Sequence, residues 1–257
     1  MTLSASSPPT PRRGVALVTG GARGIGRAIA LGLAADGYDI VIADILTEEA
    51  HATARDVEAL GRHALALSVD VADRGQVEAM VQTTIERLGR LDVAIANAAR
   101  SIRRDFIDLT WDEAWATLSV TLFGVWHTCQ FAARQMVAQG EGGKIIIIGS
   151  VHAERPYRQS SAYNVAKSGV TALGATLAGE LAPHRINVNI IHPGWTDTPG
   201  ERGRFSAADI QAGGARIPWG RLARSAEIAD MARFLCSDAA DYITGSTFKV
   251  DGGFVLP

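Results

Sequence analysis

The sequence predicts an α/β fold, a doubly wound parallel sheet of about seven strands with helices on both faces. Short apolar runs alternate with stretches of helical periodicity from residue 15 onward. The runs are apolar throughout, which is typical of parallel strands that helices cover on both faces. The expected strands are residues 15–19, 40–43, 64–69, 93–96, 144–148, 186–191 and 248–250. The expected helices are residues 24–36, 47–60, 76–88, 111–139, 162–181 and 225–236.

Size and composition fit one globular domain with a sizeable core. The chain has 257 residues, of which 47% are hydrophobic and 20% are charged. Residues 1–12 are rich in Ser, Thr and Pro, and we expect them to form a disordered tail. Residues 13–257 are then expected to form a single domain, within which the long irregular stretch 193–222 is expected to be a substrate loop or lid.

Charge and residue spacing argue against several classes of partner. The net charge is −2 without a long basic run, so we expect no nucleic acid and no membrane surface as partner. The longest apolar runs are far too short to span a bilayer. Cys129 and Cys236 are expected to be buried free thiols in a reducing, cytoplasmic compartment. The six histidines form no ligand cluster, so no metal site is expected.

The most informative spacing joins a hydroxyl, a phenol and an ammonium group. Ser150 lies thirteen residues before Tyr163, and Lys167 follows Tyr163 by four residues, one turn of the expected helix. A nearby ammonium favours the phenolate, so we expect Lys167 to lower the pKa of Tyr163 from its usual value of about 10. Such a tyrosine can exchange a proton with a carbonyl or alcohol oxygen. Chance also produces this spacing, so the pair needs support from elsewhere in the chain.

A glycine-rich loop follows the first expected strand and precedes the first expected helix. Gly20, Gly24 and Gly26 lack Cβ atoms, so the backbone can turn sharply and approach a pyrophosphate at the helix N-terminus. The alternative is an ordinary glycine-rich turn. The strand–loop–helix context favours a dinucleotide site.

The residue at the end of the second strand favours NAD as the cofactor. Asp44 can accept hydrogen bonds from the adenosine ribose hydroxyls and would repel a 2′-phosphate, and Ile45 offers no cation. Arg23, inside the glycine loop, could instead reach a 2′-phosphate, so NADP stays a weaker alternative. Asp70 closes the third strand and could bind the adenine amino group or cap the following helix.

With these motifs the chain resembles the short-chain dehydrogenase/reductase family over residues 14–253. Residues 19–26 match the family's Thr-Gly-x-x-x-Gly-x-Gly, and Ser150, Tyr163 and Lys167 match its Ser and Tyr-x-x-x-Lys. Residues 193–198 look like its Pro-Gly segment, and residues 242–245 and 250–253 are similar to its C-terminal signature. The resemblance implies a Rossmann-type domain whose cofactor-binding residues are Gly20, Arg23, Gly24, Ile25, Gly26, Asp44, Asp70, Val71, Asn97, Ala98, Tyr163, Lys167, Pro193, Gly194, Thr196 and Thr198.

Two positions depart from the family pattern. Asn97 is retained after the fourth strand, but Ala99 replaces the usual glycine and adds a methyl beside the cofactor. Thr121 stands where the family usually has an asparagine that helps to hold a water between the lysine and solvent. Its hydroxyl could substitute, another residue could, or the proton relay could be impaired.

The resemblance implies hydride transfer between NAD and a secondary alcohol or ketone. Ser150 is expected to hydrogen-bond the substrate oxygen, Tyr163 to carry the proton, and Lys167 to bind the nicotinamide ribose. The positive nicotinamide ring is expected to lower the pKa of Tyr163 further. The family also implies a homotetramer formed partly by helices 111–139 and 162–181.

Polar segments around the site favour a sugar, polyol or hydroxy acid as the small-molecule substrate. Besides Ser150, we expect His152, Arg155 and Trp195 to contact it, although His152 could be a rim residue and Trp195 could simply wall the nicotinamide pocket. The alternatives are a 3-oxoacyl thioester reductase that uses NADPH and, in another class, a non-catalytic NAD-binding scaffold or sensor.

Overall fold

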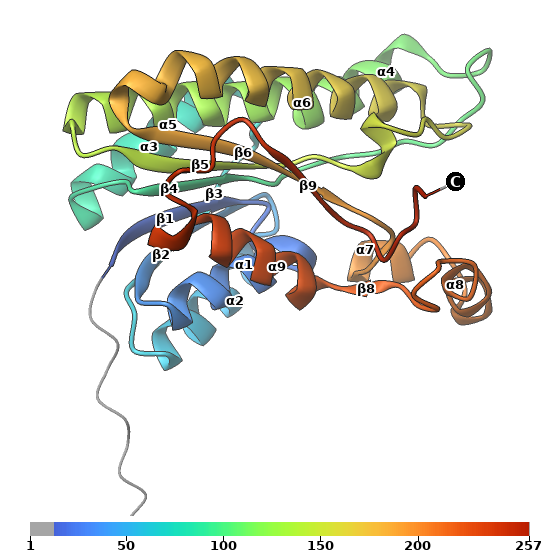
Figure 1. The fold of residues 1–257 in the computed structure, drawn as a ribbon, viewed down its shortest axis with the longest axis horizontal. Helices are drawn as coiled ribbons and strands as arrows, with labels where there is room; N and C mark the ends of the chain where they lie inside the picture. The colour runs from blue at the N-terminus through green and yellow to red at the C-terminus, as the bar shows by residue number, and fades with distance from the viewer. Residues whose placement is uncertain (1–12, 257) are drawn as a thin grey trace, which may run out of the picture.

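Seven parallel strands form the central sheet of the computed structural model, which describes residues 13–256 (Figure 1). The order β3-β2-β1-β4-β5-β6-β9 reverses direction between β1 and β4, as a doubly wound fold requires. The strands are β1 (Gly14–Thr19), β2 (Tyr38–Asp44), β3 (Ala64–Ser68), β4 (Val93–Ala96), β5 (Gly143–Ile148), β6 (Ile186–Pro193) and β9 (Thr247–Val250). This confirms the predicted fold class and all seven expected strands.

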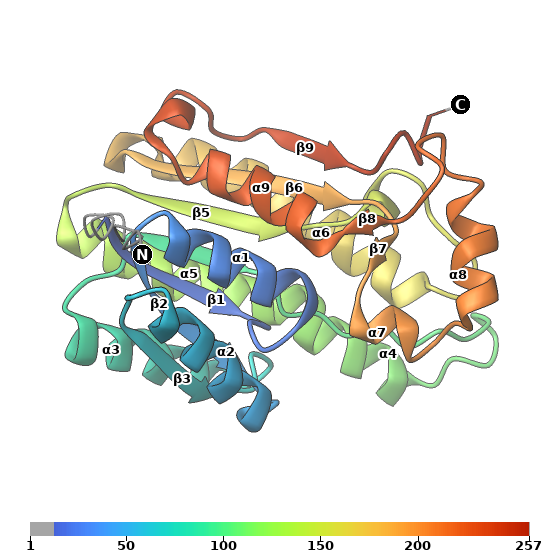
Figure 2. The same ribbon diagram turned by 90° about the horizontal axis from the view of Figure 1, so that it is seen from below.

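Helices cover both faces of the sheet. In Figure 2, α1 (Gly24–Ala35), α2 (Thr47–Ala59) and α9 (Ser225–Leu235) lie in front of the strands. The opposite face, at the top of Figure 1, carries α3 (Arg74–Leu88), α4 (Trp111–Leu118), α5 (Gly124–Gln139) and α6 (Ser161–Leu181). Each helical crossover returns the chain to the end of the sheet where the previous strand began. The strands are therefore parallel, and their carboxyl ends all lie at the opposite end of the sheet.

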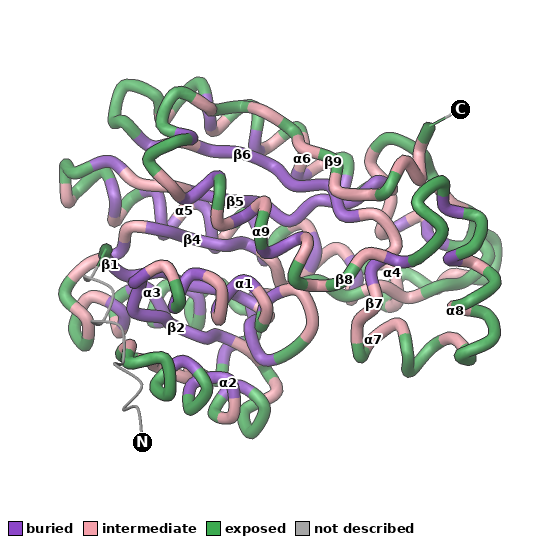
Figure 3. Tube along the Cα trace, turned by 60° about the horizontal axis from the view of Figure 1, so that its bottom comes forward, coloured by how far each residue is buried: buried purple, intermediate pink, exposed green. Residues whose placement is uncertain are grey.

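The strands are buried on both faces, which explains their uniformly apolar sequences (Figure 3). In β1, Val15 and Leu17 contribute to the core beneath α3, α5 and α6, whereas Ala16 and Val18 contribute to the core beneath α1 and α9. Alternate side chains of a strand therefore pack into two different cores, and both sets are apolar because neither faces solvent.

Two expected segments differ from the structure. The helix expected over residues 111–139 is interrupted by a π-helical turn, Ser119–Phe123, that separates α4 from α5. The stretch 193–222 is not irregular throughout, because it contains β7 (Thr196–Asp197), α7 (Pro199–Arg202) and α8 (Ala207–Gly214). Strand β7 pairs with β8 (Ala223–Arg224), which fixes both ends of this segment.

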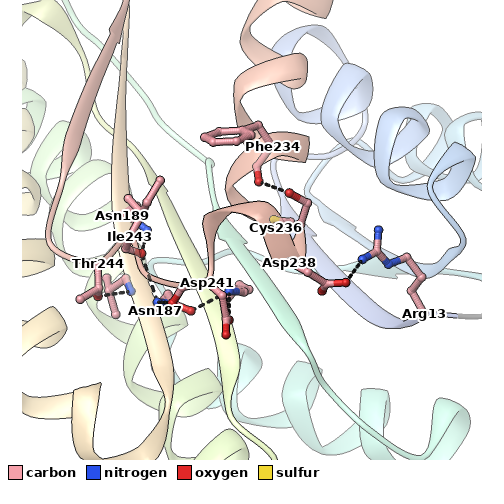
Figure 4. A network of polar contacts seen from close by, with 12 residues as sticks. Arg13, Asn187, Asn189, Phe234, Cys236, Asp238, Asp241, Ile243 and Thr244 are labelled. Carbon is pink, nitrogen blue, oxygen red and sulfur yellow. Dashed lines mark hydrogen bonds and ion pairs between the residues drawn. The ribbon is translucent and has the colours of Figure 1, made fainter.

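The C-terminal signature is held against β6 by side-chain amides (Figure 4). Asn189, fully buried, donates from Nδ2 to the Ile243 carbonyl at 2.8 Å and accepts from the Ser246 amide at 3.1 Å. Asn187 donates to the carbonyls of Asp241 and Ile243 at 3.0 and 3.1 Å. These bonds position the turn that leads into β9, so residues 242–245 anchor the edge strand.

The tail expected over residues 1–12 lies outside the described residues. Cys129 and Cys236 are both buried and free, as expected. Within residues 13–256, none of the helices is long and apolar enough to cross a membrane.

Candidate active site

A cavity of about 740 Å³ opens at the carboxyl ends of the strands. Its lining comes from the segments that follow β1, β2, β3, β4, β5 and β6, at the point where the sheet order reverses. The cavity brings the glycine loop together with Ser150, Tyr163 and Lys167. All sixteen residues predicted to bind the cofactor line it.

Two positions of the glycine loop, Gly20 and Gly26, leave no room for a side chain. Gly20 has φ of 64°, and a Cβ there would lie 2.8 Å from Nδ2 of Asn97. A Cβ on Gly26 would overlap the carbonyl oxygen of Gly20. Asn97 in turn donates to the carbonyls of Thr19 and Gly20 at 2.9 and 3.0 Å, which ties the loop to the end of β4. This rigid loop at the start of α1 has the geometry that a pyrophosphate needs.

Asp44 presents its carboxylate to the same end of the cavity. Its oxygens accept the backbone amides of Ala22 at 3.0 Å and Leu46 at 3.1 Å, which fixes their direction. Each oxygen keeps acceptor capacity for a ribose hydroxyl. Arg23 is exposed and lines the cavity as well, so both the predicted anion and the competing cation are present at this end.

The segment after the third strand lines the cavity where adenine binding is predicted. Asp70 accepts the amide of Ala72 at 2.9 Å and lines the cavity with Val71. The helix-capping alternative for Asp70 is wrong, because Asp73 caps α3 by accepting the amides of Gly75 and Gln76. The side chain of Asp70 is therefore available beside the cofactor groove.

Ser150 and Tyr163 lie close together because β5 ends at the cavity and α6 begins there. The Ser150 hydroxyl accepts the amide of His152 at 3.1 Å within a short 3₁₀ turn, Val151–Ala153. That bond uses a lone pair and leaves the hydroxyl proton to donate to a substrate oxygen. Tyr163 lies in the first turn of α6, and Lys167 lies one turn further on the same face.

The predicted effect of Lys167 on Tyr163 is not what the structure shows. Burial raises the pKa of Tyr163 to about 12, and a side-chain hydrogen bond with Ser150 acts in the opposite direction. Burial lowers the pKa of Lys167 to about 7. The ammonium donates to the Ile148 carbonyl at 2.6 Å and lies 5.5 Å from the centre of the phenol ring. Loss of hydration therefore outweighs the attraction between the two groups.

Thr121 does not replace the family's relay asparagine through its hydroxyl. The hydroxyl donates to the Arg100 carbonyl at 2.7 Å and accepts the Arg100 amide at 2.9 Å. Thr121 is fully buried in the π-helical turn and does not line the cavity. The hydroxyl uses its proton and a lone pair on the Arg100 backbone after β4. Thr121 therefore positions Arg100 at the cavity wall.

The predicted substrate residues divide into two groups. His152 and Trp195 line the cavity, whereas Arg155 is exposed and is not among the lining residues, so the structure does not bring Arg155 to the predicted site. Glu154 also points away, since it binds His192 at 2.9 Å and Lys249 at 3.0 Å. The 3₁₀ turn after Ser150 causes this split, because successive side chains leave it in different directions.

Sequence reasoning missed three aromatic residues of the lining, Tyr157, Phe205 and Phe254. Tyr157 and Phe254 stack at 6.0 Å between ring centres, although they are far apart in the sequence. Phe205 packs edge-on against Trp195 at 5.3 Å. No motif marks these residues, and the contact of Tyr157 with Phe254 depends on how the segment after β9 reaches the cavity.

The segment after β6 closes one side of the cavity through polar contacts. Trp195 donates from its indole nitrogen to Glu201 at 2.8 Å, so its ring forms a wall. Arg204 donates to the Ser101 carbonyl at 2.9 Å, which joins the segment after α7 to the loop after β4. Thr198 caps α7 and lies close to Gly24. The predicted lid therefore contacts both the glycine loop and the opposite wall.

The polar groups that line the cavity fit a nicotinamide dinucleotide. The cavity offers a cradle without side chains for the pyrophosphate, a carboxylate for a ribose, and a hydroxyl, a phenol and an ammonium at the far end. Among residues 13–256, no group of three or more His, Cys, Asp or Glu side chains could hold a metal ion.

Comparison with known proteins gives consistent matches along nearly the whole chain. Residues 20–255 match the family model described as enoyl-(acyl carrier protein) reductase. The chain is 35% identical to (-)-trans-carveol dehydrogenase of Rhodococcus erythropolis, over 94% of this chain and 97% of the relative. It is 35% identical to sorbitol dehydrogenase of Cereibacter sphaeroides, over 93% and 96%. The crystal structure of acetoin dehydrogenase YohF from Salmonella typhimurium superposes with a TM-score of 0.87 at 38% identity, covering 94% and 96%.

Proposed function

Because the chain belongs to the short-chain dehydrogenase/reductase family of NAD(P)-dependent oxidoreductases, we propose that it transfers hydride between NAD(H) and a secondary alcohol or ketone, with a sugar, polyol or hydroxy acid as substrate. The observation that carries the proposal is the shared cavity. One continuous lining contains the glycine loop, Asp44, and the Ser150, Tyr163 and Lys167 side chains.

In the proposed reaction, Ser150 and Tyr163 hold the substrate oxygen between them. The nicotinamide, when bound, supplies the hydride acceptor or donor. Ser150 donates its hydroxyl proton to the oxygen, in place of its hydrogen bond with Tyr163, and stabilises the charge that develops there. Tyr163 removes the alcohol proton during oxidation and returns it during reduction. Since burial holds the pKa of Tyr163 near 12, a positive charge beside the phenol is needed to bring it toward neutral pH.

Lys167 is proposed to bind the nicotinamide ribose through the donors that Ile148 leaves free. The ammonium has three N–H groups, and one of them is used by the Ile148 carbonyl. Ribose hydroxyls would restore hydrogen bonds that burial has removed and would raise the pKa of Lys167 from about 7. A charged Lys167 would then lower the pKa of Tyr163.

The preference for NAD is proposed from Asp44. Its fixed carboxylate matches two ribose hydroxyls and disfavours a 2′-phosphate. The preference for a polar substrate is proposed from the lining, which includes Arg100, Ser101, Arg103, Glu201 and Arg204. Relatives named for sorbitol and acetoin are consistent with a substrate of this kind.

A homotetramer also stays a prediction, which light scattering would test. Trp126 is 47% exposed, and it lies with Leu173 and Leu177 along an apolar groove between α5 and α6. Those helices form the surface through which the family resemblance predicts assembly.

The proposal is tested by following absorbance of the reduced nicotinamide with purified protein. NAD and NADP are each combined with sugars, polyols and hydroxy acids, and NADPH with an acetoacetyl thioester. We expect turnover with at least one polyhydroxy or hydroxy-acid substrate and a higher kcat/KM with NAD. Turnover on the thioester alone would overturn the proposal in favour of an acyl reductase. NAD binding without any turnover would indicate a scaffold or sensor instead.

A further inference from the structure

His152 lies inside the candidate active site, beside the proton-carrying tyrosine. Its ring meets the Tyr163 ring edge-on at 5.1 Å between centres, and it packs on Tyr157 at 4.5 Å. The residue is partly buried and lines the same cavity as Ser150. The ring of His152 therefore forms part of the cavity wall beside Tyr163.

A chain of hydrogen bonds fixes which ring nitrogen carries the proton. Asn164 donates from Nδ2 to the Tyr157 carbonyl at 2.9 Å, and a carbonyl can only accept. The amide oxygen of Asn164 must then face the other way, toward Nδ1 of His152 at 2.8 Å. Because that oxygen can only accept as well, Nδ1 carries the hydrogen.

The second ring nitrogen is left as an acceptor. Burial lowers the pKa of His152, and Arg103 and Lys167 lower it further, although the bond to Asn164 acts against this. The ring is therefore neutral near pH 7, and Nε2 keeps a lone pair. Nε2 has no hydrogen-bond partner among the described residues and is not among their buried unsatisfied atoms. Nε2 is therefore not sealed from solvent, and it belongs to a ring that lines the cavity.

Resting on the function proposed above, we propose that Nε2 of His152 accepts a hydrogen bond from a second hydroxyl of the substrate, on the carbon next to the reacting one. Ser150 and Tyr163 hold the first oxygen, and His152 follows Ser150 by only two residues on the same wall. A hydroxyl can donate to Nε2, whereas a carboxylate has no proton to give and would meet a lone pair. The site therefore selects vicinal diols and α-hydroxy ketones over simple secondary alcohols and 2-hydroxy acids.

The test compares two alcohols that differ by one hydroxyl, butane-2,3-diol and butan-2-ol. Their kcat/KM values with NAD are measured for the wild type, for His152→Phe, which keeps a ring between the two tyrosines, and for Asn164→Ala, which frees the tautomer. In the wild type we expect the diol to be preferred by roughly 10-fold or more, the scale of one hydrogen bond. In His152→Phe the diol-to-alcohol ratio should fall to about one, whatever loss both substrates share.

In Asn164→Ala the discrimination against 2-hydroxy acids should weaken, because the ring can place its proton on Nε2 and donate it to a carboxylate, whereas a hydroxyl can bind either tautomer. A wild-type enzyme without diol preference would overturn the inference, as would a ratio that His152→Phe leaves unchanged. In either case butan-2-ol or another alcohol of the panel still turns over, so the proposed function survives. Failure of every alcohol with NAD would instead remove the proposed function and this inference together.

Discussion

The two ends of the cavity are built in different ways. At the proposed adenosine end, Gly20 and Gly26 lie in the turn and helix that follow β1, and Asp44 is the last residue of β2, so two neighbouring strand ends form the lining. At the proposed substrate end, His152 and Tyr157 meet Phe254, which comes from a distant part of the chain. The first end can bind a common cofactor with little variation. The second can change its chemistry by changing side chains, so we expect it to set the choice of substrate.

The largest effect at the adenosine end is expected from Gly26→Ala. The added methyl would overlap the carbonyl oxygen of Gly20, and that backbone is held by Asn97, so it cannot easily move. We expect affinity for NAD, measured by calorimetry, to fall by at least about 100-fold, or about 2.7 kcal/mol.

Gly179→Ala is the matched control for that variant. Gly179 is an exposed position in α6 where a Cβ meets nothing within 4 Å, so NAD affinity should be unchanged. Thermal unfolding of both variants separates lost binding from lost folding. Wild-type NAD affinity in a folded Gly26→Ala protein would show that the loop does not bind the dinucleotide.

A smaller effect, on cofactor choice, is expected from Asp44→Asn. The amide keeps an oxygen acceptor but removes the charge that would repel a 2′-phosphate. The ratio of kcat/KM for NAD over NADP should fall by about 10-fold. Arg23→Ala should move the same ratio the other way, because it removes the exposed cation at this end. An unchanged ratio in both variants would place cofactor discrimination elsewhere.

The difference between the two ends of the cavity explains which parts of the site could be predicted from the sequence. Strands and the glycine loop follow from local patterns, so all seven strands and Gly20, Gly24 and Gly26 were predictable. The stacking of Tyr157 on Phe254 depends on how the segment after β9 reaches the cavity, which no local pattern encodes. The split between His152 inside and Arg155 outside depends on the direction of one 3₁₀ turn.

Electrostatics were the other weak point of sequence reasoning. Spacing predicts that Lys167 and Tyr163 are neighbours, but it does not show that Lys167 is almost completely removed from water and Tyr163 partly so. Burial reverses the expected direction of the Tyr163 pKa. The hydroxyl of Thr121 was likewise a plausible relay until its bonds to Arg100 were known.

The account rests most heavily on Tyr163 as the group that carries the proton, and Tyr163→Phe tests this directly. Turnover should fall by roughly 1,000-fold, within the range that general acid–base catalysis contributes, while NAD affinity stays near the wild-type value. Tyr242→Phe, at a fully exposed tyrosine, is the control and should behave as wild type. Near-normal turnover in Tyr163→Phe, with NAD still bound, would contradict the account.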